Sequence, residues 1–551
     1  MSNVQELSKK YFELRRLELD TAFNEIKADL QELAEYFYPR AVRFLASDVN
    51  KTNKKRNSKI IDSTPIIALR NFSSGMMSGA TSPAQNWFRF KIRNYNTPDH
   101  EVKSWCAIVE KITRDALYSS KLYNKLPIVY KQLGAFAFST LALESDYDNI
   151  FTCKVLPMGS YRYAKNFKGE VDTLVRVFSE TAKNLVEQFG EENVSQAVKD
   201  ANKKNPQQYF EVIHFVMPNP NYNMTKKWAK NKTFISVYYE KNGNENKFLS
   251  ESGFNKFPYV VFEAETNGED VYPCDCPGIN ALPDLKQLFT MVKDYGKAVK
   301  KIVSPPLKGP ARYKNRKISM LPESYIEDVE GNDQGVRPVH EVNPRILELA
   351  QEIAAMKGII KEHFYNDLFA MILNTSERGR TATEVNELKE EKMVLLSPLL
   401  EQIHSGLGIL FEWILSELFE VDILPPPPEQ IQGGEFEIEF VSTLAQAQKV
   451  QKIAGMERFS TFGINLATAL QDITLLKKFK GENMIDGYAD YANIDPDYIN
   501  PNEYIEALRI EQAQKQQQQE QLAALEQGTQ MIKNVGGVDA IGANLAARVG
   551  A

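Results

Sequence analysis

The chain has 551 residues, of which 43 % are hydrophobic, so it is long enough for several domains and apolar enough to build cores. Lys and Arg total 66 against 72 Asp and Glu, a net charge of -6. This balance excludes a strongly basic protein that coats nucleic acid through bulk charge, and it leaves open a protein that handles DNA without gripping it.

Four cysteines are too few for a disulfide framework in a chain of this length. Cys274 and Cys276 form a C-x-C pair, which differs from the C-x-x-C spacing of zinc and redox sites, and no histidine lies near it in sequence. The first ten residues have no apolar core, and no apolar run reaches the roughly 18 residues of a membrane helix. We therefore expect no bound metal, no signal peptide, no membrane span and a reducing cytoplasm during synthesis.

The first third of the chain has mainly helical periodicity. Apolar residues recur every three to four positions over 4–38, a second helix is expected over 60–80, and residues 100–143 continue the helical pattern. The segment 133–143 is so apolar that it fits either a buried helix or a buried strand.

The period changes after residue 145, where apolar and polar residues alternate as in strands. A short helix is expected over 181–189, ending at Gly190. The region 145–270 is therefore predicted to be α+β, with strands over 171–177, 211–216, 234–240 and 259–265.

Helical periodicity returns at Ile279 and runs to Val303, a length of about 37 Å. Residues 304–343 are rich in proline and glycine, and a second helix follows over 344–369. After the polar loop NTSERGR, a third long helix is expected over 382–420.

This third helix carries two local signals. Thr381 and Glu384 have the spacing of a capping box, in which the threonine caps the helix and the glutamate reaches back to its amide. Pro398 removes one helical hydrogen bond and predicts a kink. Beyond four prolines at 425–428 we expect a strand over 435–441 and helix over 443–480.

The sequence lacks the motifs of common enzymes. It has no P-loop, no G-x-G-x-x-G after a strand, no H-E-x-x-H and no G-x-S-x-G. Its carboxylates are scattered along helix faces, whereas a two-metal nuclease needs several that converge. We therefore predict that the chain is not an enzyme and needs no cofactor, which argues against an ATPase or a nuclease.

Five separate stretches resemble the head-to-tail connector, or portal, proteins of short-tailed bacteriophages. They are Ile61 to Thr64 leading into RNFSSGMMSGATSPAQNWF; Tyr161 to Tyr163 with Gly169 and Val171; Leu282 to Lys300 with Pro305 to Leu307; Phe364 to Leu368 with Thr381 to Val385; and Phe440 to Gln448. Together they span roughly residues 60–450. The chain departs from the family at Gly134 to Phe136 and at Tyr272 to Gly278, where local loop detail differs.

The resemblance implies a portal fold, mainly α with an α+β wing, whose parts follow a set order. These parts are the wing (1–277), a first stem helix (278–303), the clip (304–343), a second stem helix (344–369), the tunnel loop (370–381), a kinked wing helix with a closing strand (382–441), the crown (442–503) and a Gln-rich helical tail, partly disordered (504–551).

The resemblance also implies a function. Portal proteins form a ring, usually of twelve subunits, at one capsid vertex of the virion, through which double-stranded DNA is packaged and ejected. The implied partners are terminase, tail adaptor proteins, and the major capsid and scaffold proteins, with assembly in the host cytoplasm. The alternative is another structural virion component, such as a tail adaptor or an internal ejection protein.

Two groups of charged residues are candidates for contacts within this frame. In the clip, a basic run (Lys308, Arg312, Lys314, Arg316, Lys317) precedes an acidic run (Glu323, Glu327, Asp328, Glu330, Asp333), so the basic arm of one subunit can face the acidic arm of the next. Both runs could instead be solvated or meet terminase or adaptors.

The second group could line a DNA channel. It comprises Arg378 and Arg380 on the polar loop, and Lys293, Lys297 and Lys300, whose spacing places them on one face of the first stem helix. For the lysines, a solvated outer face or a subunit interface is an equally good interpretation.

Overall fold

The computed structural model describes residues 7–45, 60–93, 100–146, 148–223, 231–243, 247–304, 307–308, 337–338, 345–373, 382–428, 436–441, 443–472, 474, 478–492, 500, 504–505, 507–519 and 522. The chain divides into two compact units. The first comprises Met1–Lys91, Val109–Pro426 and Phe436–Ala445, and the second comprises Ile92–Ile108, Pro427–Glu435 and Gln446–Ala551. The described part is mostly helical with some sheets, which is consistent with a portal fold.

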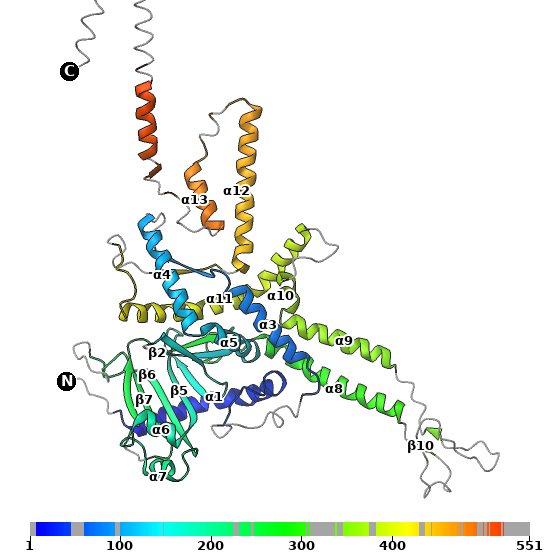
Figure 1. Ribbon diagram of the computed structural model, residues 1–551. Coiled ribbons are helices and arrows are strands. Elements are labelled where there is room, and N and C mark those ends of the chain that lie inside the picture. Colours follow the sequence, from blue (N-terminus) through cyan, green and yellow to red (C-terminus); the bar gives the residue numbers. More distant parts are fainter. Residues whose placement is uncertain are drawn as a thin grey trace, which may run out of the picture. The chain divides into compact units, whose positions relative to one another are not determined.

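The first unit contains an antiparallel five-stranded sheet with helices on both faces (Figure 1). Helix α1 (Lys9–Phe37) packs Phe12 and Leu19 against one face, and α6 (Ala182–Phe189) and α7 (Gln196–Lys204) pack against the other. In order across the sheet, the strands are β4 (Tyr161–Lys165), β5 (Val171–Thr181), β6 (Tyr209–Pro218), β7 (Phe234–Glu240) and β8 (Ser250–Phe254). Because both faces of this sheet are covered, apolar residues occupy successive positions in its strands and alternate with polar residues only in part.

A second, three-stranded sheet lies in the same unit, in the order β3 (Ile150–Val155), β2 (Phe138–Asp146), β9 (Tyr259–Glu263). It contacts α5 (Leu122–Phe136) and the long α11 (Ala382–Glu420). The helical pattern expected to continue through residue 143 ends earlier, and of the two interpretations left open for 133–143 the strand is correct from Phe138. Helix α5 ends at Phe136, Ala137 is left-handed with φ 68°, and the first six residues of β2 are all buried, so their pattern has no period to separate strand from helix.

The remaining described elements of this unit are helices and two small two-stranded ladders. Helix α3 (Thr64–Ala80) contacts α5, α9 (Ile346–His363) and α10 (Asn366–Leu373), and α8 (Pro277–Val303) contacts α9. The predicted second stem helix over 344–369 is in fact two helices, because Tyr365 has a left-handed φ of 53° between α9 and α10. Strand β1 (Phe88–Ile92) pairs with β12 (Phe436–Phe440), and β10 (Leu307–Lys308) pairs with β11 (Arg337–Pro338).

The second unit contains most of α12 (Thr443–Ala469), together with α13 (Gly481–Ala492). Phe479 packs on Phe459 with ring centroids 5.0 Å apart and lies against Gly463. The helix expected over 443–480 ends at Ala469 instead. Residues 507–519 of the Gln-rich tail are helical. Helix α4 (His100–Ser119) belongs to both units. The last 25 residues, which we expect to be poorly ordered, lie outside the described ones.

Candidate functional site

Helices α8 and α9 lie side by side and run in opposite directions (Figure 1). The start of α8 meets the end of α9, where His363 Nε2 lies 2.9 Å from Asp284 Oδ2. Beyond the far end of the pair, β10 and β11 form a short antiparallel ladder. The two predicted stem helices thus form a hairpin.

The pattern of buried residues explains why this hairpin forms. On α8, Ala281, Leu285, Leu288 and Phe289 are buried at spacings of three and four, as a helix that packs on one side requires. On α9, Ile353 and Ile360 are buried two turns apart. Pro277 occupies the first turn of α8, where its missing N–H costs nothing.

Ion pairs join the hairpin to the elements that precede it in sequence. Lys286 of α8 lies 2.8 Å from Glu32 of α1, and Lys357 of α9 lies 2.7 Å from Asp62, just before α3. Burial raises the pKa of Asp62, but hydrogen bonds from Lys357 and Thr64 outweigh it and hold the pKa below its ordinary value. These contacts fix the base of the hairpin.

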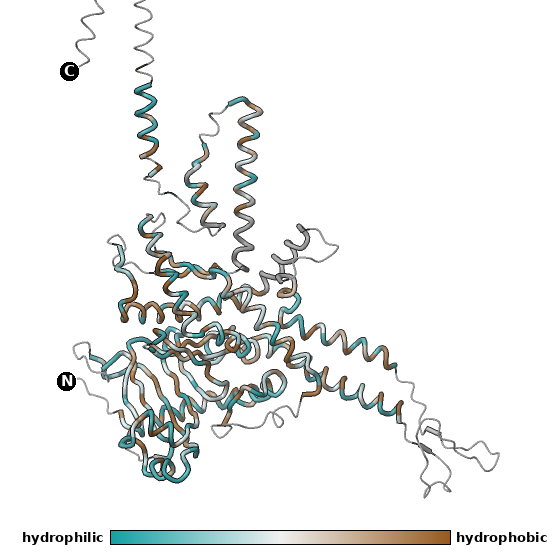
Figure 2. Tube along the Cα trace, in the orientation of Figure 1, coloured by the Kyte–Doolittle hydropathy of each residue, from teal (hydrophilic) through white to brown (hydrophobic). Residues whose placement is uncertain are grey.

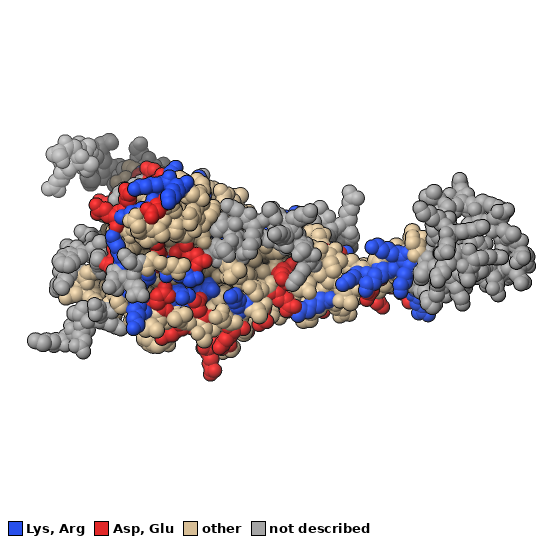
Figure 3. Space-filling model, turned by 90° about the horizontal axis from the view of Figure 1, so that it is seen from below, with Lys and Arg blue, Asp and Glu red and all other residues tan. Residues whose placement is uncertain are grey.

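A lysine stripe, defined here as Lys293, Lys297 and Lys300, runs along one flank of α8. At 3.6 residues per turn the three positions fall within about 60° of the helix circumference. All three are exposed, and among the residues that the structure describes Lys297 pairs only with Asp294 of its own helix, 2.9 Å away. Among the described residues no ion pair holds Lys293 or Lys300. Figure 3 shows Lys and Arg side chains gathered along this part of the molecule.

The opposite flank of α8 carries no base. By the same helical geometry it presents Met291, Tyr295, Ala298 and Ile302. The lysine stripe therefore lies on one side of α8, and a negatively charged ligand would meet it on that side. The sequence prediction that Lys293, Lys297 and Lys300 share a face is confirmed by the helical structure of α8.

Helix α10, which leads to the predicted tunnel loop, is seated on α3 by aromatic packing. Phe72 contacts the rings of Phe364 and Phe369, with centroids 6.1 Å apart in each case. Gly75 provides the space, because a Cβ there would stand 2.1 Å from Cγ of Phe369. Sequence reasoning missed this contact, although the small residues of SSGMMSGA were its visible signal.

Several predicted site residues lie outside the described part of the chain. They are Arg378, Arg380 and Thr381, and the clip residues Arg312, Lys314, Arg316, Lys317, Glu327 and Asp328. Glu384 lies in the first turn of α11, where the backbone alone is described. Helix α11 runs through Pro398, and the kink expected there stays a prediction.

In the described part of the chain, no group of three His, Cys, Asp or Glu side chains could hold a metal ion. Cys276 is buried, which raises the pKa of its thiol to about 12, whereas Cys274 is exposed. None of the helices described has both the length and the apolar character of a membrane span.

Comparison with known proteins identifies the family. The model of the family "Bacteriophage head to tail connecting protein" matches residues 11–499. The chain is 35 % identical over 509 residues to the portal protein of Salmonella phage epsilon15, covering 92 % of this chain and 91 % of that one. It is also 35 % identical over 514 residues to the probable portal protein of Bordetella phage BPP-1, covering 92 % of each.

The chain therefore belongs to the bacteriophage head-to-tail connecting protein family. The resemblance drawn from the sequence motifs is confirmed, and the chain has the function of a portal, or head-tail connector. Among solved structures, a chain of the virion of a native gene transfer agent particle covers 73 % of this chain at 10 % identity. Its TM-score of 0.35 is too low to support an inference about the fold.

Proposed function

We propose that this protein assembles into a ring, of twelve subunits, at one vertex of the phage capsid, and that double-stranded DNA passes through its centre during packaging and ejection. The family membership supports the connector role, and the one-sided lysine stripe of α8 carries the channel assignment. The role is structural and uses no cofactor, and the relatives support a location in the virion.

In this proposal the channel makes sparse basic contacts with DNA. Duplex DNA carries one negative charge per about 1.7 Å, so a continuous basic lining would hold it and oppose sliding. An acidic protein with isolated rings of Lys293, Lys297 and Lys300, and of Arg378 and Arg380 on the tunnel loop, would guide DNA and still release it.

Ring assembly is tested by native mass spectrometry and negative-stain images of one purified sample. A closed ring with a central hole and a mass near twelve times 62.7 kDa is the expected result. A stable small oligomer without a hole would overturn the proposal and favour a tail adaptor. If the protein is monomeric when purified alone, the measurement is repeated after co-expression with the scaffold protein, and persistent monomers would also count against it.

The lysine stripe is tested with a triple substitution to glutamine at Lys293, Lys297 and Lys300. A matched control replaces three exposed lysines of α6 and α7, namely Lys183, Lys203 and Lys204. In phage complementation we expect the stripe variant to form rings and capsids but to package less DNA than the control. Equal packaging by the two variants would remove these lysines from the channel.

We further propose that the clip links neighbouring subunits through charge. The basic arm with Arg312, Lys314, Arg316 and Lys317 would face the acidic arm with Glu327 and Asp328 of the next subunit, while terminase and then tail adaptors dock at the same end. Reversing the charges at Arg316 and Lys317 should impair ring assembly, and adding reversed charges at Glu327 and Asp328 should restore it. Unimpaired assembly of the first variant would assign these residues to solvent or to external partners.

A further inference from the structure

A cavity of about 210 Å³ lies in the first unit, and none of the residues that line it belongs to the hairpin of α8 and α9. Its walls are α1, residues 43–45, the turn at 157–162 and the face of β5 and β6 that is turned toward α1. One water occupies about 30 Å³ in the liquid, so the space holds several waters or one small polyatomic ion. The backbone N–H of Arg43 donates to Met158 O at 2.8 Å and closes one side of the cavity.

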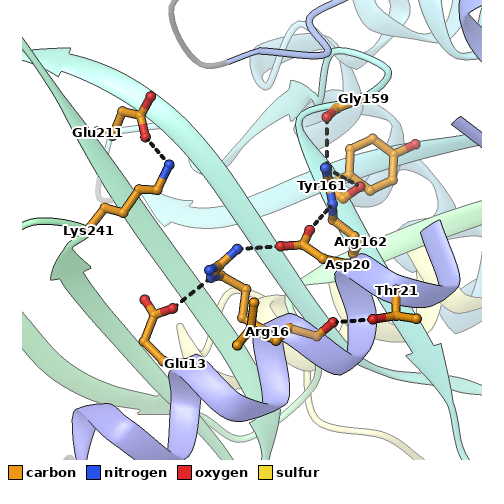
Figure 4. Close-up of polar contacts among 10 residues, drawn as sticks. Glu13, Arg16, Asp20, Thr21, Gly159, Tyr161, Arg162, Glu211 and Lys241 are labelled. Carbon is orange, nitrogen blue, oxygen red and sulfur yellow. Dashed lines mark hydrogen bonds and ion pairs between the residues drawn. The ribbon is translucent and has the colours of Figure 1, made fainter. Parts of the chain in front are cut away.

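The inner wall is a network of buried and partly buried charges (Figure 4). Asp20 accepts from two arginines: Nε of Arg162, at 2.7 Å, and a terminal nitrogen of Arg16. Arg162 is 8 % exposed, and it also donates to Gly159 O at 2.8 Å. Arg16 takes a second carboxylate, Glu13, at 3.0 Å. The two guanidinium groups are therefore held rigidly at the cavity wall before any ligand enters.

The rim carries further charges. Lys241 and Glu211 form an ion pair 2.6 Å long and are partly exposed, which marks the side open to solvent (Figure 4). Arg43 also lines the cavity, and no ion pair holds it among the described residues. Arg176 lines it too, but its side chain points to the opposite sheet face, because Val175 and Val177 beside it pack toward α1.

The charges of this cavity do not balance. Four basic residues line the cavity on this side: Arg16, Arg43, Arg162 and Lys241. Two carboxylates line it with them, Asp20 and Glu211, and a third, Glu13, pairs with Arg16 from outside the lining, so one positive charge is left uncompensated. Unpaired charge at a partly buried site is costly, and an anion that enters relieves the cost. Guanidinium groups suit a tetrahedral oxyanion because their planar forks donate paired hydrogen bonds to its oxygens.

We propose that this cavity binds a phosphate group, with Arg43 as the residue that the ligand neutralises. The phosphate could come from the free ion or from the backbone of nucleic acid, and the test distinguishes the two. The site is independent of ring assembly and of the lysine stripe, so it can fail while the portal function stands.

Binding is tested by isothermal titration of the full chain with inorganic phosphate at constant ionic strength. Wild type should show saturable binding, and Arg43→Gln should raise Kd about tenfold or more, the loss expected for one charge-assisted hydrogen bond. The matched control is Arg15→Gln, because Arg15 is an exposed arginine of α1 that pairs with Glu18 and does not line the cavity. Circular dichroism confirms that both variants fold.

The outcomes are distinct. Saturable binding that Arg43→Gln weakens and Arg15→Gln preserves supports the site. Adding a short DNA duplex then separates the sources: displacement of phosphate assigns the site to the nucleic-acid backbone, and its retention assigns the site to the free ion. The absence of saturable binding at millimolar phosphate, or equal affinity in Arg43→Gln and wild type, would overturn the proposal.

Discussion

The ring of Phe369 on α10 lies against the backbone of Gly75 on α3, at a place where a β-carbon would stand 2.1 Å from Cγ of the ring. The two residues are 294 positions apart in sequence. Their contact holds α10 on α3, and the last residues of α10 enter the range predicted as the tunnel loop (370–381).

Gly75→Ala should therefore destabilise the protein. A carbon at 2.1 Å forces the Phe369 ring or the α3 backbone to move, and overpacking of this kind costs about 1–3 kcal/mol. The matched control is Gly358→Ala on α9, where nothing lies within 4 Å of the added carbon and the better helix former should be neutral or stabilising by up to about 1 kcal/mol. Urea unfolding measures both changes. A Gly75→Ala protein as stable as wild type would show that the contact is loose.

His214 should make the stability of the first unit depend on pH. Its ring nitrogens bond Ser236 Oγ at 2.9 Å and Tyr259 Oη at 2.8 Å, and burial, aided by the charge of Arg176, lowers its pKa to about 3. The unfolded chain has an ordinary histidine pKa near 6.5, so it binds more protons than the folded chain between these values. Stability should fall as pH drops from 6.5 toward 3. Melting curves of His214→Gln should show a lower Tm at pH 7 and a shallower acid slope. An unchanged slope would show that other groups set the acid dependence.

Asp20→Asn should be strongly destabilising, because Asp20 neutralises Arg162, which is 8 % exposed and stacks over the Phe23 ring at 4.1 Å. Removing one partner of a buried ion pair costs about 3–5 kcal/mol. Glu18→Gln is the matched control, because its pair with Arg15 is exposed and contributes at most about 1 kcal/mol. Comparable losses in the two variants, measured by chemical unfolding, would contradict the buried-network interpretation.

The Asp62–Lys357 pair should couple α9 to the start of α3. We expect Lys357→Met to lower the free energy of unfolding by about 1 kcal/mol, because the pair is partly shielded from solvent. A double-mutant cycle with Asp62→Asn should give a coupling energy of similar size. Because the folded pKa of Asp62 lies below its ordinary 3.8, its contribution is complete above that pH and is lost as pH falls below it. A coupling energy near zero would show that the ion pair does not stabilise the folded protein.

The sequence predicted the long helices and some of the strands closely. Strand β7 spans Phe234–Glu240 and α11 spans Ala382–Glu420, both as expected, and α8 begins two residues before the expected start. These elements carry their own signals, either a period of 3.6 or 2 or a terminal proline. For β2 the sequence left helix and strand open, because its first six residues are all buried and their pattern has no period.

The sequence alone determined the family and the basic flank of α8. The family follows from the order of the motifs along the chain, and the basic flank follows from the spacing of the lysines. Only the tertiary structure decided which distant residues meet. Gly75 faces Phe369, Asp62 binds Lys357, and Arg43 closes a cavity beside Arg162. Such pairings depend on how helices and sheets pack, and packing is set by the combined shape and charge of many residues rather than by any short stretch.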